Sequence, residues 1–166
     1  MGCHMRPYET VPGTTDKVLE LSIPIITGAF RTGGSKERAL EEVIKLFETI
    51  EVKRDLRPKV AIFGDLYARD NDVLNQNIIS VIEKNGGEVF TTPYSELVKL
   101  IAEPYIKKWF KEGNYIGAIT SKILRQAVVL FENRYNPYFN RILKGKSDIA
   151  LPPVTEVLEK FNMTID

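Results

Sequence analysis

Residues 59–64 read Lys59-Val60-Ala61-Ile62-Phe63-Gly64, and this run decides the fold class. The run is short, rich in β-branched and aromatic residues, and ends at a glycine, which is typical of a buried parallel strand. A second β-rich run covers residues 88–92 and stops at Pro93. Between the two runs, apolar residues recur at helical spacing at Val73, Leu74, Ile78, Ile79 and Ile82. A strand, a helix and a strand within about 33 residues predict a βαβ unit with a right-handed crossover.

The segments before this unit predict one clear helix. Ser35 precedes a stripe of apolar residues at helical spacing, and acidic residues lie early in the segment, where they suit the helix dipole. The stripe consists of Leu40, Val43, Ile44, Phe47 and Ile50. We expect residues 6–35 to be irregular, because prolines and glycines mark turns at both ends and Pro24 makes a central strand unlikely. Residues 14–16 are suited to cap a short helix over residues 17–21.

The segment after the βαβ unit predicts a helical insertion over about residues 94–146. We expect helices over 95–102, 105–111, about 115–134 and 138–143, with breaks at Pro104 and at Asn136-Pro137. Residues 149–151 suggest a strand, residues 154–161 a helix, and residues 164–166 the start of a further strand. The sequence therefore predicts an α/β fold, with a Rossmann- or flavodoxin-like sheet and a helical insertion, excised or truncated from a larger protein. The expected divisions are residues 1–5, 6–56 and 57–166.

Composition excludes several classes of protein. The chain has 166 residues, with 23 Lys plus Arg and 22 Asp plus Glu, so its net charge of +1 gives no sign of nucleic-acid binding. No apolar run approaches the roughly 18 residues that a membrane helix needs. Cys3 is the single cysteine and His4 the single histidine, which excludes a self-contained zinc site or a four-cysteine cluster. We expect a cytoplasmic protein whose residues 1–5 are a cloning remnant.

The first candidate site is the loop that follows the first strand, because ligands of open α/β sheets lie beyond the carboxyl ends of the strands. Its ligand-binding or cleft-lining candidates are Gly64, Asp65, Tyr67, Arg69 and Asn71. The guanidinium of Arg69 suits a phosphate or a carboxylate, and the amides of the following helix would favour an anion. The alternative is that Asp70, Asn71 and Asp72 compete as helix N-caps, with Arg69 as an exposed partner.

The second candidate site follows the second strand and contributes Thr92, Tyr94 and Ser95. Both loops would face the same crevice, where these hydroxyls would contact a ligand. The alternative is a strand end followed by a serine cap, with Pro93 fixing the turn. The aromatic residues of the helical section are interpreted as core, and the lysines beside Trp109 as a solvated helix face. No nucleotide-binding glycine motif, no Ser-His pair and no metal site is predicted, so the catalytic and metal residues of this chain are expected to be none.

Residues 57–69 resemble the (R)-2-hydroxyacyl-CoA dehydratase family. More closely, they look like the large CoA-substrate-specific enzyme activases and the dehydratase-like double-cubane cluster proteins, which carry a strand and loop of the form R/K-P-K-V-G/A-I-x-G-D/E-x-Y-x-R. The segment Arg6-Pro7-Tyr8-Glu9 is similar to one that these proteins carry upstream. Residues 85–89 and 92–94 are similar to their second strand and its loop. The resemblance covers about residues 6–166.

The resemblance implies ATP-driven, low-potential electron transfer in anaerobic metabolism, in which an activator passes an electron to a partner that carries iron–sulfur clusters. This chain departs from the pattern because it has no cysteine beyond Cys3 and no ATPase motif. The expected function is therefore a non-catalytic scaffold domain, with a 4Fe-4S cluster only in the parent protein. Its expected partners are other domains of that parent and an ATP-dependent activator, without nucleic acid or membrane. The alternatives are a module that binds a small anionic ligand (nucleotide, CoA or phosphate) and an interaction domain that uses the helical insertion.

Overall fold

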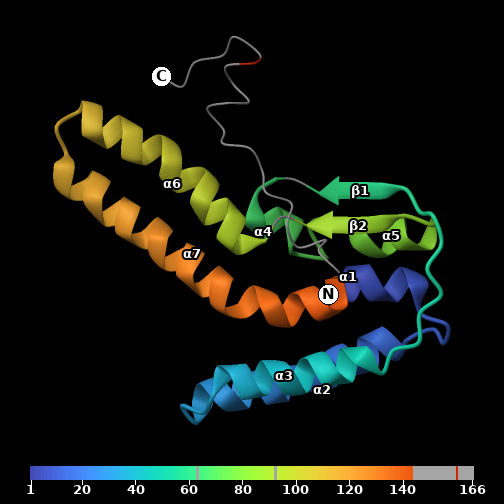
Figure 1. Ribbon diagram of the computed structural model, residues 1–166. Helices are drawn as coiled ribbons and strands as arrows, with labels where there is room; N and C mark the ends of the chain where they lie inside the picture. Colours follow the sequence, from blue (N-terminus) through green and yellow to red (C-terminus); the bar gives the residue numbers. More distant parts are fainter. Residues whose placement is uncertain (63, 92, 144–159, 161–166) are drawn as a thin grey trace. The chain divides into compact units, whose positions relative to one another are not determined.

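The computed structural model describes residues 1–62, 64–91, 93–143 and 160. These residues form a mostly helical α/β fold with a two-stranded parallel sheet (Figure 1). The chain divides into two compact units, of which the first contains residues 1–91 and 137–147 and the second contains residues 92–136 and 148–166. The two predicted segments at 149–151 and 154–161, and the start of a strand at 164–166, lie outside the described residues.

The first unit begins with two short helices that lead into a helical hairpin. Helix α1 spans Gly2–Met5 and the 3-10 helix η1 spans Arg6–Tyr8. Helix α2, Thr14–Arg31, and helix α3, Lys36–Glu48, then lie side by side (Figure 1). A short antiparallel bridge between Glu9 and Val52 joins the segment before α2 to the segment after α3. The residues that the sequence suggested to be a cloning remnant thus form α1, in which Met5 is buried.

Helix α3 is confirmed as predicted. The side chain of Ser35 caps it by accepting a hydrogen bond from the Arg38 N–H at 3.2 Å, which supplies a partner for one free amide of the first turn. Every member of the predicted apolar stripe is buried, and Ile44 and Phe47 are 0% and 1% exposed. The core of the first unit therefore centres on this helix.

Helix α2 was not predicted beyond residues 17–21, and the expectation that residues 6–35 are irregular was wrong. Pro24 lies inside the helix, where it removes one backbone hydrogen bond. The helix continues through it because Thr15, Val18 and Ser22 lie three and four residues apart and are all buried. Burial of that face outweighs the local preference of one proline.

The predicted βαβ unit is confirmed in outline. Strand β1 spans Lys59–Ile62 and strand β2 spans Glu88–Thr91, and the two pair in parallel with Lys59 opposite Glu88. Helix α5, Ile78–Lys84, packs on β2 and ends before Gly86, whose positive φ of 84° favours glycine. The next residue must also be a glycine, but for lack of space: a Cβ atom at Gly87 would lie 2.6 Å from Cγ2 of Ile82. This close approach lets α5 lie against the sheet.

Two details of this unit differ from the prediction. Strand β1 is not buried, because Lys59 and Ala61 are exposed. The crossover helix starts at Ile78 rather than near Val73, and Val73 and Leu74 are 86% and 55% exposed. Residues 71–77 form turns instead, in which Gln76 and Asn77 both have φ of 55°. Asn75 accepts and donates hydrogen bonds that stabilise these turns, so polar local contacts replace the predicted first turns of the helix.

The second unit contains two long helices. Helix α6 spans Tyr94–Lys111 and helix α7 spans Tyr115–Leu143, with its last residues, from Pro137, in the first unit. Both predicted breaks were wrong, because each helix continues through its proline, Pro104 or Pro137. Lys99 on α6 bonds to Glu96 and to Glu132 of α7, at 2.8 Å for the latter. This ion pair links the two helices across the hairpin.

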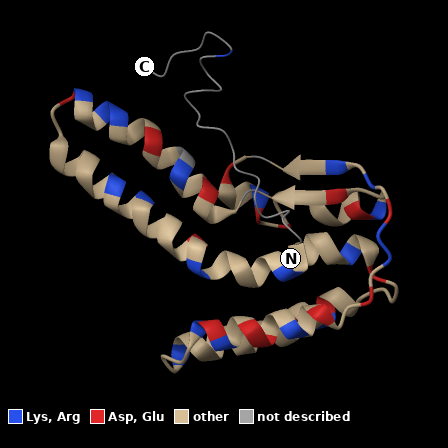
Figure 2. Ribbon diagram, in the orientation of Figure 1, with Lys and Arg blue, Asp and Glu red and all other residues tan. Residues whose placement is uncertain are grey.

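The prediction that the eight aromatic residues of the helical section form a core was wrong, because four are half-buried, four are exposed and none is fully buried. Tyr105, Phe110, Tyr115 and Phe131 are 48–65% exposed. Two of them contact each other at the turn between the helices, where the rings of Phe110 and Tyr115 lie 5.4 Å apart. Figure 2 shows few charged residues along α7. No helix in the described part of the chain combines the length and apolar character that a membrane crossing requires.

Candidate functional site

The loop after β1 turns at Gly64, as predicted, since its φ of 138° favours a residue without a side chain. A one-turn helix, α4, spans Leu66–Arg69 directly after it. Asp65 caps this helix, because its carboxylate accepts hydrogen bonds from the N–H groups of Tyr67 at 2.9 Å and Ala68 at 3.3 Å. The carboxylate of Asp65 is therefore used to hold the loop in shape.

Asn71 has the same role one turn later. Its Oδ1 atom accepts hydrogen bonds from the N–H groups of Val73 at 3.0 Å and Leu74 at 3.1 Å. Two of the side chains that the sequence offered as ligand contacts thus cap backbone amides. The capping alternative is confirmed for Asn71, whereas the capping role of Asp65 was not predicted.

Arg69 is buried, with 6% of its surface exposed, so the expectation of an exposed partner was wrong. Its guanidinium donates hydrogen bonds to both carboxylate oxygens of Asp70, at 2.8 and 3.0 Å. The backbone carbonyl of Arg69 also accepts a hydrogen bond from the side chain of Asn75 at 2.7 Å. The positive charge that was predicted to attract a phosphate is already neutralised by the neighbouring residue.

Tyr67 differs from the other members of the loop, because it is 72% exposed and presents its ring to solvent. Of the second loop, Tyr94 is 59% exposed and Ser95 is half-buried, and both lie at the start of α6 in the second unit. Thr92 lies outside the described residues. Gly64, Asp65, Tyr67, Arg69 and Asn71 lie together in the first unit, so the structure brings five of the eight candidates into one loop.

The helix whose start was predicted to favour an anion begins later in the chain than expected, at Ile78. Helix α5 has seven residues and its first residue follows Asn77, a left-handed residue without a side-chain cap. Along the chain, α4 and the turns of residues 71–77 lie between Gly64 and Asp65 and the start of α5. Helix amides of this kind attract an anion only at the first turn.

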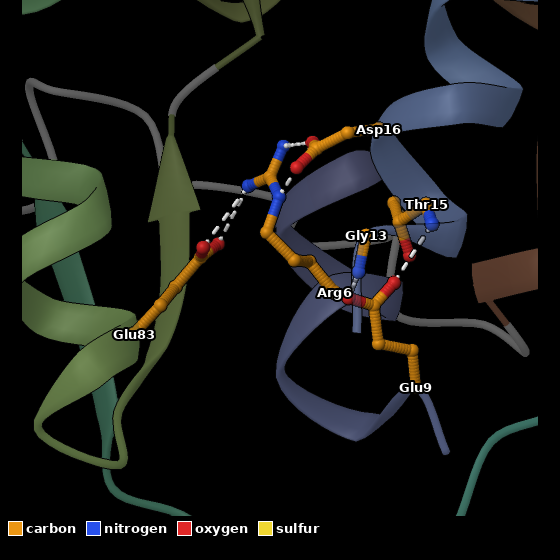
Figure 3. A network of polar contacts seen from close by, with 6 residues as sticks. All are labelled: Arg6, Glu9, Gly13, Thr15, Asp16 and Glu83. Carbon is orange, nitrogen blue, oxygen red and sulfur yellow. Dashed lines mark hydrogen bonds and ion pairs between the residues drawn. The ribbon is translucent and has the colours of Figure 1, made fainter. Parts of the chain in front are cut away.

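A network that the sequence did not predict joins the N-terminal segment to the βαβ unit (Figure 3). The guanidinium of Arg6 donates two hydrogen bonds of 3.0 Å to the carboxylate of Glu83 and one of 2.9 Å to Asp16. Burial lowers the pKa of Arg6, but its hydrogen bonds to Glu83 and Asp16 outweigh burial and raise it overall. For Glu83 burial dominates and raises the pKa, although Arg6 opposes it. Arg6 thus holds α2 and α5 together.

Glu9 completes the network in Figure 3. Its carboxylate accepts hydrogen bonds from the N–H groups of Gly13 at 2.6 Å and Thr15 at 2.7 Å, at the start of α2. Burial raises the pKa of Glu9, but the hydrogen bonds from Thr15 and Gly13 lower it further than burial raises it. Glu9 is therefore the cap of α2, supplied from outside the helix.

The most buried acid of the described residues lies beside this network. Glu88 is 1% exposed, and its carboxylate accepts a hydrogen bond from the Tyr8 hydroxyl at 2.7 Å and lies 2.9 Å from Nδ1 of His4. Burial and the bond to Glu88 raise the pKa of Tyr8 to about 12. The guanidinium groups of Arg54 and Arg57 lie 5.0 and 5.3 Å from the ring centre of Tyr8. The one signal in the sequence was a glutamate at the first position of an apolar strand.

Within the described residues, no set of three or more histidine, cysteine, aspartate and glutamate side chains is arranged to hold a metal ion. A shallow depression of about 500 Å³ lies elsewhere in the first unit and contains none of the candidate residues. It is lined by Glu37, Arg38, Glu41, Glu42, Lys45 and Tyr138. What the networks do is hold the N-terminal segment onto β2 and α5.

Comparison with known proteins adds no family. The chain matches no protein-family model, and the comparisons with curated proteins and with solved structures found no match. The resemblance to the dehydratases and activases therefore rests on the residues quoted from the sequence.

Proposed function

We propose that this chain is a non-catalytic scaffold domain of a larger protein related to the 2-hydroxyacyl-CoA dehydratases and their activases. The observation that carries the proposal is that polar side chains of the candidate loop form hydrogen bonds within the loop itself. Asp65 and Asn71 cap backbone amides, and Arg69 is buried against Asp70. A loop whose polar side chains are bonded internally has a fixed shape and few groups left for binding a ligand.

The loop would act as one wall of a cleft in the larger protein. Its outward group is the ring of Tyr67, which combines an apolar body with a hydroxyl and is enriched at interfaces. In this role, Tyr67 contacts another domain, and the caps below it keep α4 in place.

The iron–sulfur cluster that the resemblance implies does not fit the donors of this chain. Such clusters are held by cysteine thiolates, usually four, and the sequence contains one cysteine. Cys3 is half-buried, and burial together with the charge of Glu83 raises the pKa of its thiol, which disfavours the thiolate that a metal needs. The proposal therefore assigns the cluster and the ATP-dependent step to other parts of the larger protein.

Iron and sulfide content, with an anaerobic ultraviolet–visible spectrum, tests the proposal. Two samples are compared, this chain and the product of the uninterrupted reading frame that contains it. We expect the long product to be brown with a broad thiolate-to-iron band and this chain to be colourless. A long product without iron, or a reading frame that ends near Asp166, would contradict the proposal.

Thermal shift with CoA, ATP and phosphate separates the scaffold from the small-ligand module. A ligand at about 100 times its dissociation constant stabilises a protein by about 2.7 kcal/mol. We expect no shift with the isolated chain. A shift that is lost in Arg69→Gln and kept in Tyr67→Phe would favour the ligand module instead.

A further inference from the structure

Among the described residues, strand β1 is paired on one side only, with β2. The Glu88 N–H donates to the carbonyl of Pro58 at 2.9 Å, which fixes the phase of the parallel ladder. In such a ladder alternate residues of a strand direct their backbone groups to opposite sides. Val60 and Ile62 therefore face β2, whereas the N–H and C=O groups of Lys59 and Ala61 face away from it. No other described residue bonds to these outward groups.

The two strands differ in how well they are covered. Glu88 and Val89 of β2 are 1% and 0% exposed, because α1 and α5 both pack on this strand. Lys59 and Ala61 of β1 are exposed. The open side of the sheet is thus the free edge of β1, as Figure 1 shows for the described part of the chain.

This edge carries none of the usual protection. Proteins shield exposed edges with proline, bulges or charged side chains. Strand β1 contains no proline, and its one charged residue, Lys59, directs its Nζ to the ring of Phe90 on β2, 5.6 Å from the ring centre. The side chain of Lys59 therefore lies over a face of the sheet and does not protect the edge of β1 from pairing.

A two-stranded parallel sheet with one open edge is not a complete structure. Parallel strands occur almost entirely in sheets that are covered on both faces, and small sheets depend on further strands or on packing against helices for their stability. The unpaired groups of Lys59 and Ala61 match one kind of partner, an extended backbone with the same repeat. On the face shared by Val60 and Ile62, alternate apolar side chains of such a segment would extend the layer that packs against α5.

We propose that the free edge of β1 receives a third strand, an extended segment of a partner polypeptide with apolar residues at alternate positions. Its backbone bonds to the N–H and C=O groups of Lys59 and Ala61. The proposal goes beyond the scaffold function, since the sheet needs this strand whether or not the assembled protein holds iron.

Hydrogen exchange at single amides tests the added strand. The samples are the isolated chain and the native assembly, purified from the cells that make it. In the isolated chain, we expect the Val60 and Ile62 amides to exchange at least about 100-fold more slowly than those of Lys59 and Ala61. In the native assembly, we expect the Lys59 and Ala61 amides to become protected to a similar degree.

Two results would overturn the proposal. One is that Lys59 and Ala61 exchange freely in the native assembly. The other is that they are already protected in the isolated chain, since the strand would then come from this chain or from a second copy. The iron content of the assembly tests the scaffold proposal separately. An assembly without iron in which the Lys59 amide is protected would overturn the scaffold proposal and leave the added strand. An assembly with iron in which the Lys59 amide exchanges freely would overturn the added strand and leave the scaffold proposal.

A pair of variants expressed in the same cells gives a second test. Ala61→Pro removes an outward N–H and leaves the ladder to β2, since proline is tolerated where the amide faces away from the sheet. Ala61→Val keeps the N–H and serves as the matched control. We expect Ala61→Pro to lose the protection of Lys59 and the partner, while Val60 and Ile62 stay protected. Retention of both in Ala61→Pro would contradict the added strand.

Discussion

At the scale of single residues, three carboxylates stabilise the first unit, and two of them, Glu83 and Glu88, join segments 77 to 84 residues apart. Glu88 binds the N-terminal segment through Tyr8 and His4, Glu83 binds it through Arg6, and Glu9 caps α2. A buried carboxylate costs free energy unless donors surround it, so each of these acids depends on its partners. Loss of one partner is therefore more damaging than loss of an exposed ion pair.

Removal of the cap tests Glu9. At neutral pH, we expect Glu9→Ala to lower the free energy of unfolding by about 1 kcal/mol, because two amides of α2 lose their acceptor. Glu9→Gln keeps a neutral acceptor and should lose less. Urea denaturation of the three proteins measures the difference, and equal stabilities at pH 7 would contradict this role.

The pH dependence of the same substitution follows from the lowered pKa of Glu9. A carboxyl group with a pKa below its unfolded value of 4.5 stabilises the fold above that pH. This contribution disappears as the pH falls through the folded pKa. The gap between the wild type and Glu9→Ala should therefore be full at pH 6 and shrink below pH 4.5. A gap that widens on acidification would show that the carboxylate is not the stabilising form.

Removal of an acceptor tests Glu88. We expect Glu88→Ala to destabilise the protein by about 3 kcal/mol, because it leaves the Tyr8 hydroxyl and His4 buried without this carboxylate. Tyr8→Phe, which removes one donor, should cost about 1 kcal/mol. A double-mutant cycle measured by chemical denaturation gives their coupling, and additive effects would contradict a direct bond.

At the scale of elements, local signals predicted some helices and failed for others. Ser35 and the apolar stripe of α3 agree with each other, so its position could be derived from the sequence. Pro104 and Pro137 each suggested a break that the structure does not have, and Pro24, which was used only as an argument against a strand, lies inside a helix. A proline removes one hydrogen bond, whereas burial of a helix face involves several side chains, and only the fold decides which of these effects is larger.

The candidate loop shows the same division. The position of Gly64 and the capping role of Asn71 followed from local chemistry. The network around Glu88 did not, because Tyr8 and His4 lie 80 and 84 residues away in the sequence. The burial of Arg69 was not predicted either. Sequence patterns show how apolar and polar residues are spaced along one helix or strand. They carry little information about which other segment packs against that helix or strand.

The proline in α2 gives a prediction at this scale. Pro24 is exposed, and two hydroxyls beside it, those of Ser22 and Thr27, bond to carbonyls of the preceding turn. We expect Pro24→Ala to stabilise the protein by roughly 1–2 kcal/mol, because alanine restores the backbone N–H donor that proline lacks. This net value allows for the opposing effect that alanine makes the unfolded chain more flexible and so stabilises the unfolded state. The thermal midpoint measures this, and a lower midpoint would show that the proline sets a needed bend.

At the scale of the whole molecule, the two units differ in what they bury. The core of the first unit contains large side chains, such as Ile44 and Phe47, whereas the residues of α6 and α7 with the least exposure in the second unit are Ala102 and Ala118. Along α7, large apolar residues remain exposed at Ile116, Ile119, Ile123 and Leu130. A surface of this kind is unusual for a protein that works alone and is consistent with the proposed place of this chain in a larger assembly.

A pair of substitutions on α7 tests this difference. Ile123 is 64% exposed and Ala118 is 3% exposed. We expect Ile123→Glu to change the free energy of unfolding by less than about 0.5 kcal/mol and Ala118→Glu to destabilise the second unit by several times that amount. Denaturation followed by the fluorescence of Trp109 reports on this unit. Equal effects of the two substitutions would mean that this exposed face is covered in the isolated chain.

The network between the N-terminal segment and β2 also sets an order of events during synthesis. The ribosome synthesises residues 1–9 long before Glu83 and Glu88. Arg6, Tyr8 and His4 therefore leave the ribosome before their carboxylate partners have been synthesised. Contacts over 77 to 84 residues form late and slowly. Helices α2 and α3 form between neighbouring segments and are complete earlier. The beginning of this chain is therefore among the last parts of the first unit to be locked in place, and until then a trigger factor or another holding chaperone would find it accessible.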